Sequence, residues 1–346
     1  MSVNQPRPQA RSTLLAALAA LATVLLVILS TADSPGDTLR TFLLGPWSNR
    51  YALGNLLSRA SMLTLTGAGV VIAFRAGVFN LGGEGQVYLA AVIASSVLVM
   101  LPVPGVVAVV LAAGAAAALG GLSGWLRHAT GADELITSFL LASAITPVLN
   151  YLLVAPLRDQ SSNLLATPKI PEATRLMRLL PPSHLNSGTL WALAAVVVLW
   201  IVLHRTLFGY ELRIVGYNRR LAQYAGMSVG RYTIIPMAIS GMLHGLAGTV
   251  LVMGVHHRSI VQFSGGLGWN GIAVALIARN RPSLIVPAAI FFAFLEAGSR
   301  AAVIQNQATW ELGSIVQAVV FLFVTADVLA RRRRRRTKHT TQEQNA

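Results

Sequence analysis

Long apolar runs recur along this sequence, and they fix the kind of environment in which the chain can fold. A helix needs about 20 apolar residues to cross a bilayer, and about ten stretches approach that length. Hydrophobic residues make up 54% of the 346 residues and charged residues only 11%, whereas roughly a quarter of a soluble domain is charged. The mean hydropathy of +0.63 agrees. We predict an all-α, polytopic membrane protein.

The predicted spans, about ten in all, would form two related halves. The third span begins at a glycine cluster and the eighth is short, so both could be broken or re-entrant helices. The ten are expected at 12–30, 52–74, 84–101, 106–126, 135–155, 189–207, 232–254, 267–278, 284–298 and 312–330.

The net charge of +15 is distributed in a way that favours a membrane over nucleic acid. Six arginines, 331–336, follow the last apolar run, and most other basic residues lie in short loops. Such an excess is typical of cytoplasmic loops. We therefore place both termini in the cytoplasm. No nucleic-acid partner is expected, because no basic surface interleaved with aromatic residues is left over.

The chain is expected to divide into a cytoplasmic N-terminus (1–11), a transmembrane domain (12–330) and a basic cytoplasmic tail (331–346). The first apolar run is longer than that of a typical signal peptide, so it is expected to remain as a span. An external loop at 156–188 is more basic than acidic, against the charge rule. Its prolines indicate an ordered cap or docking surface.

A glycine-rich stretch after the second span carries the one acid of the apolar first third of the chain. Glu84 lies among Gly82, Gly83 and Gly85, and an intramembrane charge usually marks a functional site. Asn80 is a good N-cap, which would place Glu84 in the first turn of the next helix. We interpret the stretch as a helix break beside a pathway. An ordinary cytoplasmic turn, in which Glu84 only caps a helix, fits equally well.

A second glycine cluster, at 265–271, precedes a span in the second half. Two glycine-interrupted segments in matching halves point to a binding region between repeats, which five spans per half would make inverted. Glycines also help membrane helices to pack closely, and residues 112–121 are best explained in that way.

No catalytic or metal-binding set is found, and no enzyme activity or cofactor is expected. The only lysines, Lys169 and Lys338, do not follow a glycine, so a P-loop is impossible. No cysteine is present and the histidines lack zinc-site spacing. Asp133 and Glu134 are interpreted as helix-capping residues.

The stretch 206–231 is too charged to cross a bilayer. Leu212, Val215, Leu221, Ala222 and Ala225 give a rough helical stripe beside arginines. The stretch is therefore expected to form a short amphipathic helix, which could lie in the membrane interface or dock into a groove of a partner.

Several of these stretches carry a family resemblance. Residues 77–86, GVFNLGGEGQ, resemble the GxFNxGxEGQ signature of ATP-binding cassette (ABC) importer permeases, in particular the nucleoside branch of the simple-sugar and branched-chain amino acid group. The resemblance extends to residues 133–138, 212–227, 240–248 and 268–277. His244 stands where the family has alanine, and FLLA at 139–142 replaces the family's MLNYIA.

The resemblance implies a permease subunit that forms the path for a small polar solute, most simply a nucleoside or related compound, with a simple sugar next. It implies that the protein lies in the lipid bilayer of a bacterial inner membrane. It also implies three protein partners: a cytoplasmic ATPase, an extracytoplasmic solute-binding protein and a second permease, identical or paired. In the family, loop 206–231 holds the coupling helix that sits in the ATPase.

The candidate residues follow from this comparison and from their chemistry. The pathway residues are Phe79, Asn80, Glu84, Gln86, Trp269 and Asn270, and the coupling residues are Arg213, Gly216, Asn218, Ala222, Ala225 and Gly226. The alternative is an ion-coupled secondary transporter, with Glu84, Glu296 and Glu311 as ion sites, because broken helices and inverted repeats serve such folds as well.

Overall fold

A computed structural model describes residues 34–306 continuously, together with isolated positions between 22 and 32 and between 315 and 322. Most of the predicted spans 12–30 and 312–330, Glu311, and both predicted cytoplasmic termini lie outside the described residues. The described part is helical and contains no strand, only two isolated backbone bridges. The all-α prediction is confirmed for this part of the chain.

Seven described helices are long and apolar enough to cross a membrane. Their bounds agree with seven predicted spans to within a few residues, except that the last helix extends to residue 306 instead of 298. The short eighth span is an 11-residue helix, α11 (Leu267–Ile277). The total of about ten stays a prediction. The seven are α3 (Arg50–Arg75), α4 (Gly83–Met100), α5 (Gly105–Thr130), α6 (Glu134–Val154), α7 (Gly188–Arg205), α10 (Arg231–Leu251) with its π-helical end η3 (Val252–His256), and α12 (Ile285–Asn306).

The chain forms two compact units, Met1–Ala52 with Phe294–Ala346, and Leu53–Ala293. In the first, α2 (Pro35–Leu44) packs on the end of α12, where the Phe42 and Phe294 rings meet edge to face at 6.0 Å. Trp47, in the 3₁₀ turn η1 (Gly45–Trp47), stacks on Phe294 at 5.9 Å. The candidate site lies entirely in the second unit.

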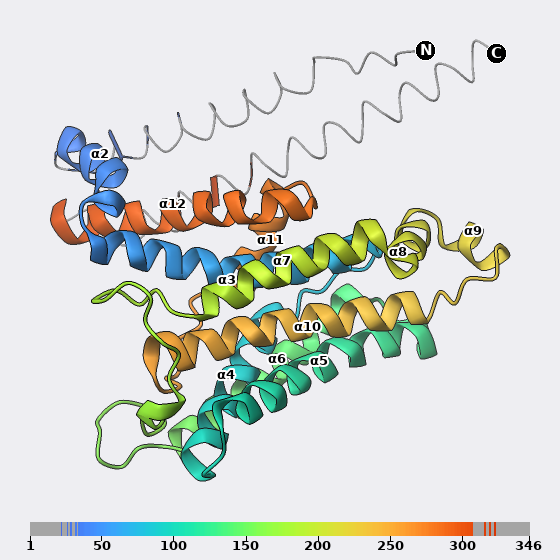
Figure 1. Cartoon of the computed structure of the whole chain (residues 1–346), viewed down its shortest axis with the longest axis horizontal. Helices are drawn as coiled ribbons and strands as arrows, with labels where there is room; N and C mark the ends of the chain where they lie inside the picture. The colour runs from blue at the N-terminus through green and yellow to red at the C-terminus, as the bar shows by residue number, and fades with distance from the viewer. Residues whose placement is uncertain are drawn as a thin grey trace. The chain divides into compact units, whose positions relative to one another are not determined.

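The second unit is built around α5 and α10, which run side by side (Figure 1). Small residues allow this close approach. A Cβ atom at Gly241 would lie 2.2 Å from the carbonyl oxygen of Ala116, and one at Gly120 would lie 2.4 Å from that of Met237. The predicted close-packed helix face at 112–121 is therefore confirmed, and larger side chains would push the two helices apart.

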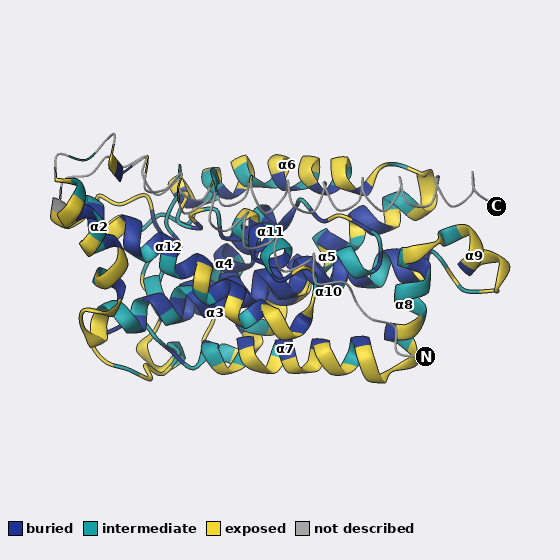
Figure 2. Ribbon diagram, turned by 90° about the horizontal axis from the view of Figure 1, so that it is seen from above, coloured by how far each residue is buried: buried dark blue, intermediate teal, exposed yellow. Residues whose placement is uncertain are grey.

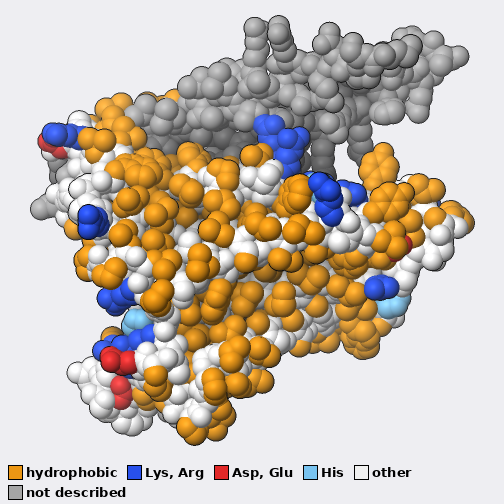
Figure 3. All heavy atoms as spheres, viewed as in Figure 1, with side chains coloured by type: hydrophobic (Ala, Val, Ile, Leu, Met, Phe, Trp, Pro, Cys, Tyr) orange, Lys and Arg blue, Asp and Glu red, His pale blue; other side chains and the backbone are white. Residues whose placement is uncertain are grey.

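Burial differs sharply among the helices of this unit. Figure 2 shows α4 and α11 largely buried, whereas α6 and α7 expose most of their outer faces. On α6 the buried residues Glu134, Ser138 and Ala142 follow one helical face. Apolar side chains cover much of the surface in Figure 3, and charged ones are few. Exposed apolar faces of this length suit a bilayer.

The predicted external loop is ordered and lies across the chain that follows α10. Its backbone donates hydrogen bonds from Thr167 to Ser259 at 2.9 Å, and from Ile170 to His257 at 2.8 Å. A 3₁₀ turn, η2 (Glu172–Thr174), is its only described helix. These bonds satisfy backbone groups that would otherwise be orphaned. The side of the membrane on which the loop lies stays a prediction.

Candidate functional site

The glycine-rich stretch is a break between two helices. α3 ends at Arg75 and α4 begins at Gly83, whose N-cap is Gly82. The predicted N-cap role of Asn80 is therefore wrong, because its Oδ1 atom accepts a hydrogen bond at 2.9 Å from the Gly82 amide, outside the helix. Glu84 does lie in the first turn of α4, as predicted.

Asn80 and Gln86 belong to a buried hydrogen-bond network. The Nδ2 atom of Asn80 donates to Gln86 Oε1 and to Ser240 Oγ of α10, both at 2.9 Å. Gln86 Nε2 donates back to Asn80 Oδ1 at 3.2 Å. Both residues are only 1% exposed, so in this conformation they hold the break against α10.

Glu84 joins the two glycine clusters. Its Oε1 atom accepts a hydrogen bond from the Gly266 amide at 3.2 Å, and its Oε2 atom accepts one from the Gly268 amide at 2.8 Å. Both amides are at the start of α11, and Glu84 itself is at the start of α4. The carboxylate therefore neutralises the partial positive charge of two helix N-termini at once.

The two N-termini touch through their backbones. A Cβ atom at Gly268 would lie 2.2 Å from the Glu84 amide nitrogen, so no other residue fits there. Gly265 and Gly266 have φ of +58° and +71°, a region that favours glycine. The second cluster is thus required both for its turn and for its approach to α4.

The segment that leads into α11 follows one face of α4 at three levels. Ser259 Oγ lies 2.8 Å from Ser95 Oγ, and the Gln262 amide donates to the Tyr88 hydroxyl at 3.4 Å. Glu84 forms the third level. Because residues 84, 88 and 95 share a helical face, the segment lies antiparallel to α4.

A pocket of about 240 Å³ opens between this segment, α4 and α6. It is lined by Glu84 and Tyr88 of α4, Thr146 of α6, and the run Gln262, Ser264, Gly265 and Gly266. Of these, the predicted pathway residues included only Glu84, and the predicted second glycine cluster included Gly265 and Gly266. Tyr88 could have been found from the sequence, because it follows Glu84 by four residues on the same helix face. Nothing in the sequence indicated that Thr146 and Gln262 would line the same pocket.

The predicted aromatic pathway residues are exposed but do not line the pocket. Trp269 is 42% exposed and lies 6.1 Å, ring to ring, from Phe139 of α6. Phe79 is 39% exposed and lies 4.9 Å from the Phe74 ring. Asn270 is partly exposed, one residue beyond Trp269. The predicted pathway residues therefore fall into three sets. Asn80 and Gln86 are buried, Glu84 lines the pocket, and the other three lie outside the pocket lining.

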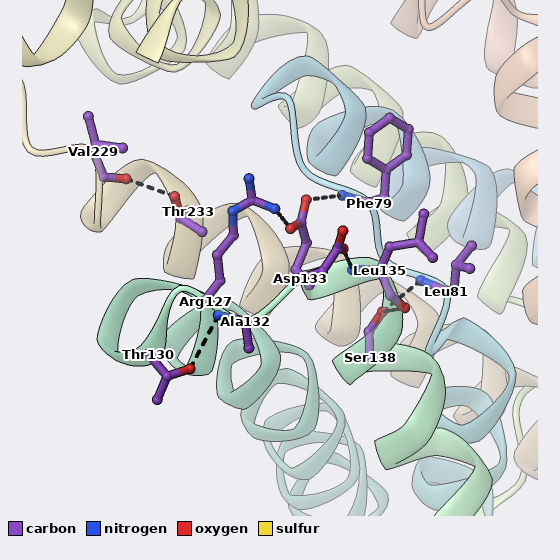
Figure 4. Close-up of polar contacts among 11 residues, drawn as sticks. Phe79, Leu81, Arg127, Thr130, Ala132, Asp133, Leu135, Ser138, Val229 and Thr233 are labelled. Atoms are coloured by element: carbon purple, nitrogen blue, oxygen red, sulfur yellow. Dashed lines mark hydrogen bonds and ion pairs between the residues drawn. The ribbon is translucent and has the colours of Figure 1, made fainter. Parts of the chain in front are cut away.

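The break is also fastened to the start of α6, as Figure 4 shows. The Phe79 amide donates to Glu134 Oε1 at 3.2 Å, and the Leu81 amide donates to Ser138 Oγ at 3.0 Å. Glu134 is buried and forms an ion pair with Arg127. Asp133 caps α6 as predicted, through the Leu135 amide at 2.8 Å. The capping prediction for Glu134 is wrong, because its side chain turns toward Arg127 and the break.

The predicted amphipathic helix is in fact two helices, α8 (Leu207–Tyr217) and α9 (Arg219–Tyr224). Asn218 separates them and caps α9 by accepting a bond from the Leu221 amide at 3.1 Å. Gly216 packs on the end of α3, since a Cβ atom there would lie 2.3 Å from the Arg75 carbonyl oxygen. Ala222 is buried, and Arg213 is half-buried. Asn218, Ala225 and Gly226 are exposed.

His244 is accommodated by glycines on two neighbouring helices. Its ring is fully buried, and Nδ1 lies 2.7 Å from the Ser240 carbonyl oxygen. Cβ atoms at Gly69 and Gly83 would lie 2.8 and 2.5 Å from the ring. The histidine that departs from the family pattern therefore fills space beside the break. Among the described residues no cluster of histidine and carboxylate side chains could hold a metal ion.

A family model described as a branched-chain amino acid transport system permease component matches residues 52–325. The match includes both glycine clusters and α8–α9. The chain belongs to this permease family.

Individual permeases from three organisms are similar over most of their length. A probable riboflavin import permease of Treponema pallidum is 32% identical, over 90% of this chain and 84% of that protein. A guanosine ABC transporter permease of Bacillus subtilis is 31% identical, over 92% and 93%. A glucose ABC transporter permease of Haloferax volcanii is 30% identical, over 92% and 88%.

A solved structure shares the fold. PsaBC from Streptococcus pneumoniae, in complex with Fab, superimposes with a TM-score of 0.50 at 14% identity, over 84% of this chain and 95% of that chain. At this identity the likeness concerns the fold alone.

The permease is a multi-pass membrane subunit of an ABC importer and not an enzyme. ATP hydrolysis belongs to a partner ATPase, and the family also implies a solute-binding protein. The family membership that residues 77–86 indicated is confirmed. The relatives do not favour the alternative of an ion-coupled transporter.

Proposed function

We propose that this permease imports a nucleoside or a closely related compound. Relatives named for guanosine and for nucleosides support this solute. Riboflavin and glucose, in the names of two others, share two properties with nucleosides: each is uncharged at neutral pH, and each carries vicinal hydroxyl groups. The shared chemistry supports an uncharged, hydroxylated solute, with a simple sugar as the second choice.

The observation that carries the proposed pathway is the pairing of Glu84 with Gly266 and Gly268. Discontinuous helices whose N-termini converge within a membrane domain are typical of transport sites. Here the convergence adjoins a pocket that the polar side chains of Glu84, Gln262 and Ser264 reach, in an apolar molecule where isolated polar groups are costly. We place the solute path along this pocket, with Trp269 and Phe139 as an exposed stacking face for a base.

The proposed contact surface for the ATPase is the exposed part of α8–α9. Tyr217 is 90% exposed, Tyr224 89% and Leu221 57%. Large exposed aromatic side chains are typical of protein interfaces. The predicted residues Asn218, Ala225 and Gly226 lie among them. Gly216 and Ala222 are proposed instead to hold the helices against the permease, because both face inward.

A continuous set of contacts supports coupling between this surface and the pocket. Gly216 packs on the end of α3, the break that follows is held by Glu134 and Ser138, and Glu84 then joins α4 to α11. Movement of α8 by the ATPase would therefore act on the backbone next to the pathway. This transmission requires two stable arrangements of the same helices.

The finer layout is also a proposal. The same arrangement occurs twice: a long helix is followed by a glycine-containing break and then by another helix. The two instances are α3–α4 and α10–α11, and both second helices begin next to the Glu84 carboxylate. This supports two inverted halves and, with the predicted outer pair, about ten spans. Two such permeases, identical or paired, would surround one path. Both termini would then be cytoplasmic. Because the chain has no cysteine, single cysteines at positions 8 and 340 can test this by labelling with a membrane-impermeant thiol reagent.

Uptake in proteoliposomes tests the solute. The permease, its ATPase and its solute-binding protein should take up labelled uridine or guanosine in an ATP-dependent way, and faster than glucose. Faster uptake of glucose would replace the nucleoside with a sugar. Uptake by the permease alone, driven by an ion gradient, would contradict the ABC mechanism itself.

A further inference from the structure

We propose that the pocket between α4, α6 and residues 262–266 binds the vicinal hydroxyl groups of the solute. This inference rests on the proposed function, since it names the part of the solute that the pathway receives. At about 240 Å³, the pocket is smaller than the 300–1,000 Å³ typical of drug-sized ligands. It therefore suits one ring of a two-ring solute, with the second ring outside.

Glu84 supplies the principal acceptors. A carboxylate has about four lone-pair sites on its two oxygens and donates nothing. The Gly266 and Gly268 amides each occupy one site, on different oxygens. Each oxygen therefore keeps a free site, and the two oxygens are spaced to accept from two adjacent hydroxyl groups.

Two side chains in the segment that leads into α11, Gln262 and Ser264, make no hydrogen bond to another described residue. Ser264 is 7% exposed, yet its hydroxyl makes no hydrogen bond within the described chain. The hydroxyl lines the pocket, so it can donate to or accept from a solute hydroxyl that enters there. Gln262 lines the same pocket at a φ of +60°, and strained backbone of this kind is concentrated at binding sites.

The remaining hydroxyls of the pocket can only accept. Thr146 Oγ1 already donates to the Ala142 carbonyl oxygen at 2.7 Å, and the Tyr88 hydroxyl donates to Asn150 Oδ1 at 2.6 Å. Together with Glu84, they give the pocket a surplus of acceptors. Neither lysine nor arginine lines it. The Arg59 guanidinium donates to the carbonyl oxygen of Gly265 at 3.1 Å, so one positive charge lies at the edge of the pocket. A hydroxylated ring matches the acceptors, whereas a phosphorylated solute would place its charge beside the Glu84 carboxylate.

Binding to the permease–ATPase complex in nanodiscs, without the solute-binding protein, tests the pocket. Two matched pairs are compared: uridine with 2′,3′-dideoxyuridine, and methyl ribofuranoside with its 2,3-dideoxy form. Loss of two hydrogen bonds should weaken binding by roughly tenfold in the unmodified complex. Ser264→Ala and Thr146→Val should each lower that ratio by about threefold. Ser96→Ala, on α4 but outside the pocket, is the matched control and should leave the ratio unchanged.

The outcomes separate this inference from the proposed function. Uridine uptake without any preference for the hydroxylated partner would overturn the pocket and leave the nucleoside assignment intact. A ratio unchanged in both Ser264→Ala and Thr146→Val would also overturn it. A third outcome is that the complex binds methyl ribofuranoside more tightly than its 2,3-dideoxy form, that both variants lower this ratio, and that no nucleoside is taken up. This outcome would support the pocket and reject the nucleoside as the solute.

Discussion

Gly216 of α8 rests directly on Gly77, at the start of the break that leads to Glu84. A Cβ atom at Gly77 would lie 2.9 Å from the Gly216 carbonyl oxygen, and Gly77 has a φ of +69° that favours glycine. The helix proposed to receive the ATPase movement is therefore in backbone contact with the segment next to the pathway.

Gly216→Ala is expected to abolish coupled uptake while the protein still inserts into the membrane. Its Cβ atom would meet the Arg75 carbonyl oxygen at 2.3 Å, so α8 must shift. Gly114→Ala is the matched control, because Gly114 is exposed on α5, away from α8–α9, and open space surrounds it. Uptake and ATP hydrolysis are measured together in proteoliposomes. Equal losses of coupling in both variants would contradict the contact argument.

Glu84→Gln should reduce transport by roughly tenfold or more. The amide offers one acceptor where Gly266 and Gly268 require two, and the loss of a charged hydrogen bond costs about 1.5–3 kcal/mol. Initial rates of uptake are compared with those of Glu172→Gln, an exposed acid on the loop before α7. Unchanged rates in Glu84→Gln would return this residue to a capping role without importance for transport.

Asn80→Ala should destabilise the permease by about 2 kcal/mol, because it leaves Gln86, Ser240 and the Gly82 amide without a partner. Thermal unfolding in detergent measures this, with the exposed Asn163→Ala as control. The preference among solutes should not change, since Asn80 does not line the pocket. An altered preference at full stability would move Asn80 from the structural network into the pathway.

Tyr224→Ala should weaken association with the ATPase by about thirtyfold, the effect of removing one aromatic hot spot. Tyr151→Ala provides the comparison, since Tyr151 is 67% exposed but lies on α6, away from α8–α9. Affinity is measured with purified ATPase and permease in nanodiscs. Full affinity in Tyr224→Ala and in Tyr217→Ala would show that the ATPase binds elsewhere.

Acidification should destabilise the segment after α10. Burial, followed by the nearby Arg175 and Arg178, lowers the pKa of His257 below 6.5. The unfolded chain then binds a proton that the folded chain does not, so stability is complete above about pH 6.5 and falls as the pH drops below it. The unfolding temperature should decrease from pH 7.5 to pH 5.5, and less so in His257→Asn. An equal decrease in both proteins would assign the effect to other groups.

The sequence alone was enough to predict the membrane helices, because burial in lipid requires long apolar runs whatever their neighbours are. It also paired the two glycine clusters and placed Glu84 in a first turn. The sequence did not show which way polar side chains turn. Asn80 and Glu134 carry the residue types of helix caps, yet both bond to groups on neighbouring segments.

The pocket lay beyond prediction for a related reason. Its walls come from positions far apart in the chain, Tyr88, Thr146 and Gln262, and no local pattern states that these meet. The division at Asn218 did have a local signal, since asparagine is a preferred N-cap. There the amphipathic stripe concealed the boundary between α8 and α9.

The segment 259–268 is attached to α4 near Ser95, at Tyr88 and at Glu84. Three attachments along one helix prevent it from swinging out as a lid without breaking all of them. α4 and the start of α11 should therefore travel as one rigid piece during a transport cycle. Any gate must then form on another side of the pocket. The remaining wall is α6, which supplies Thr146, and its movement would have to break the hydrogen bond from Tyr88 to Asn150.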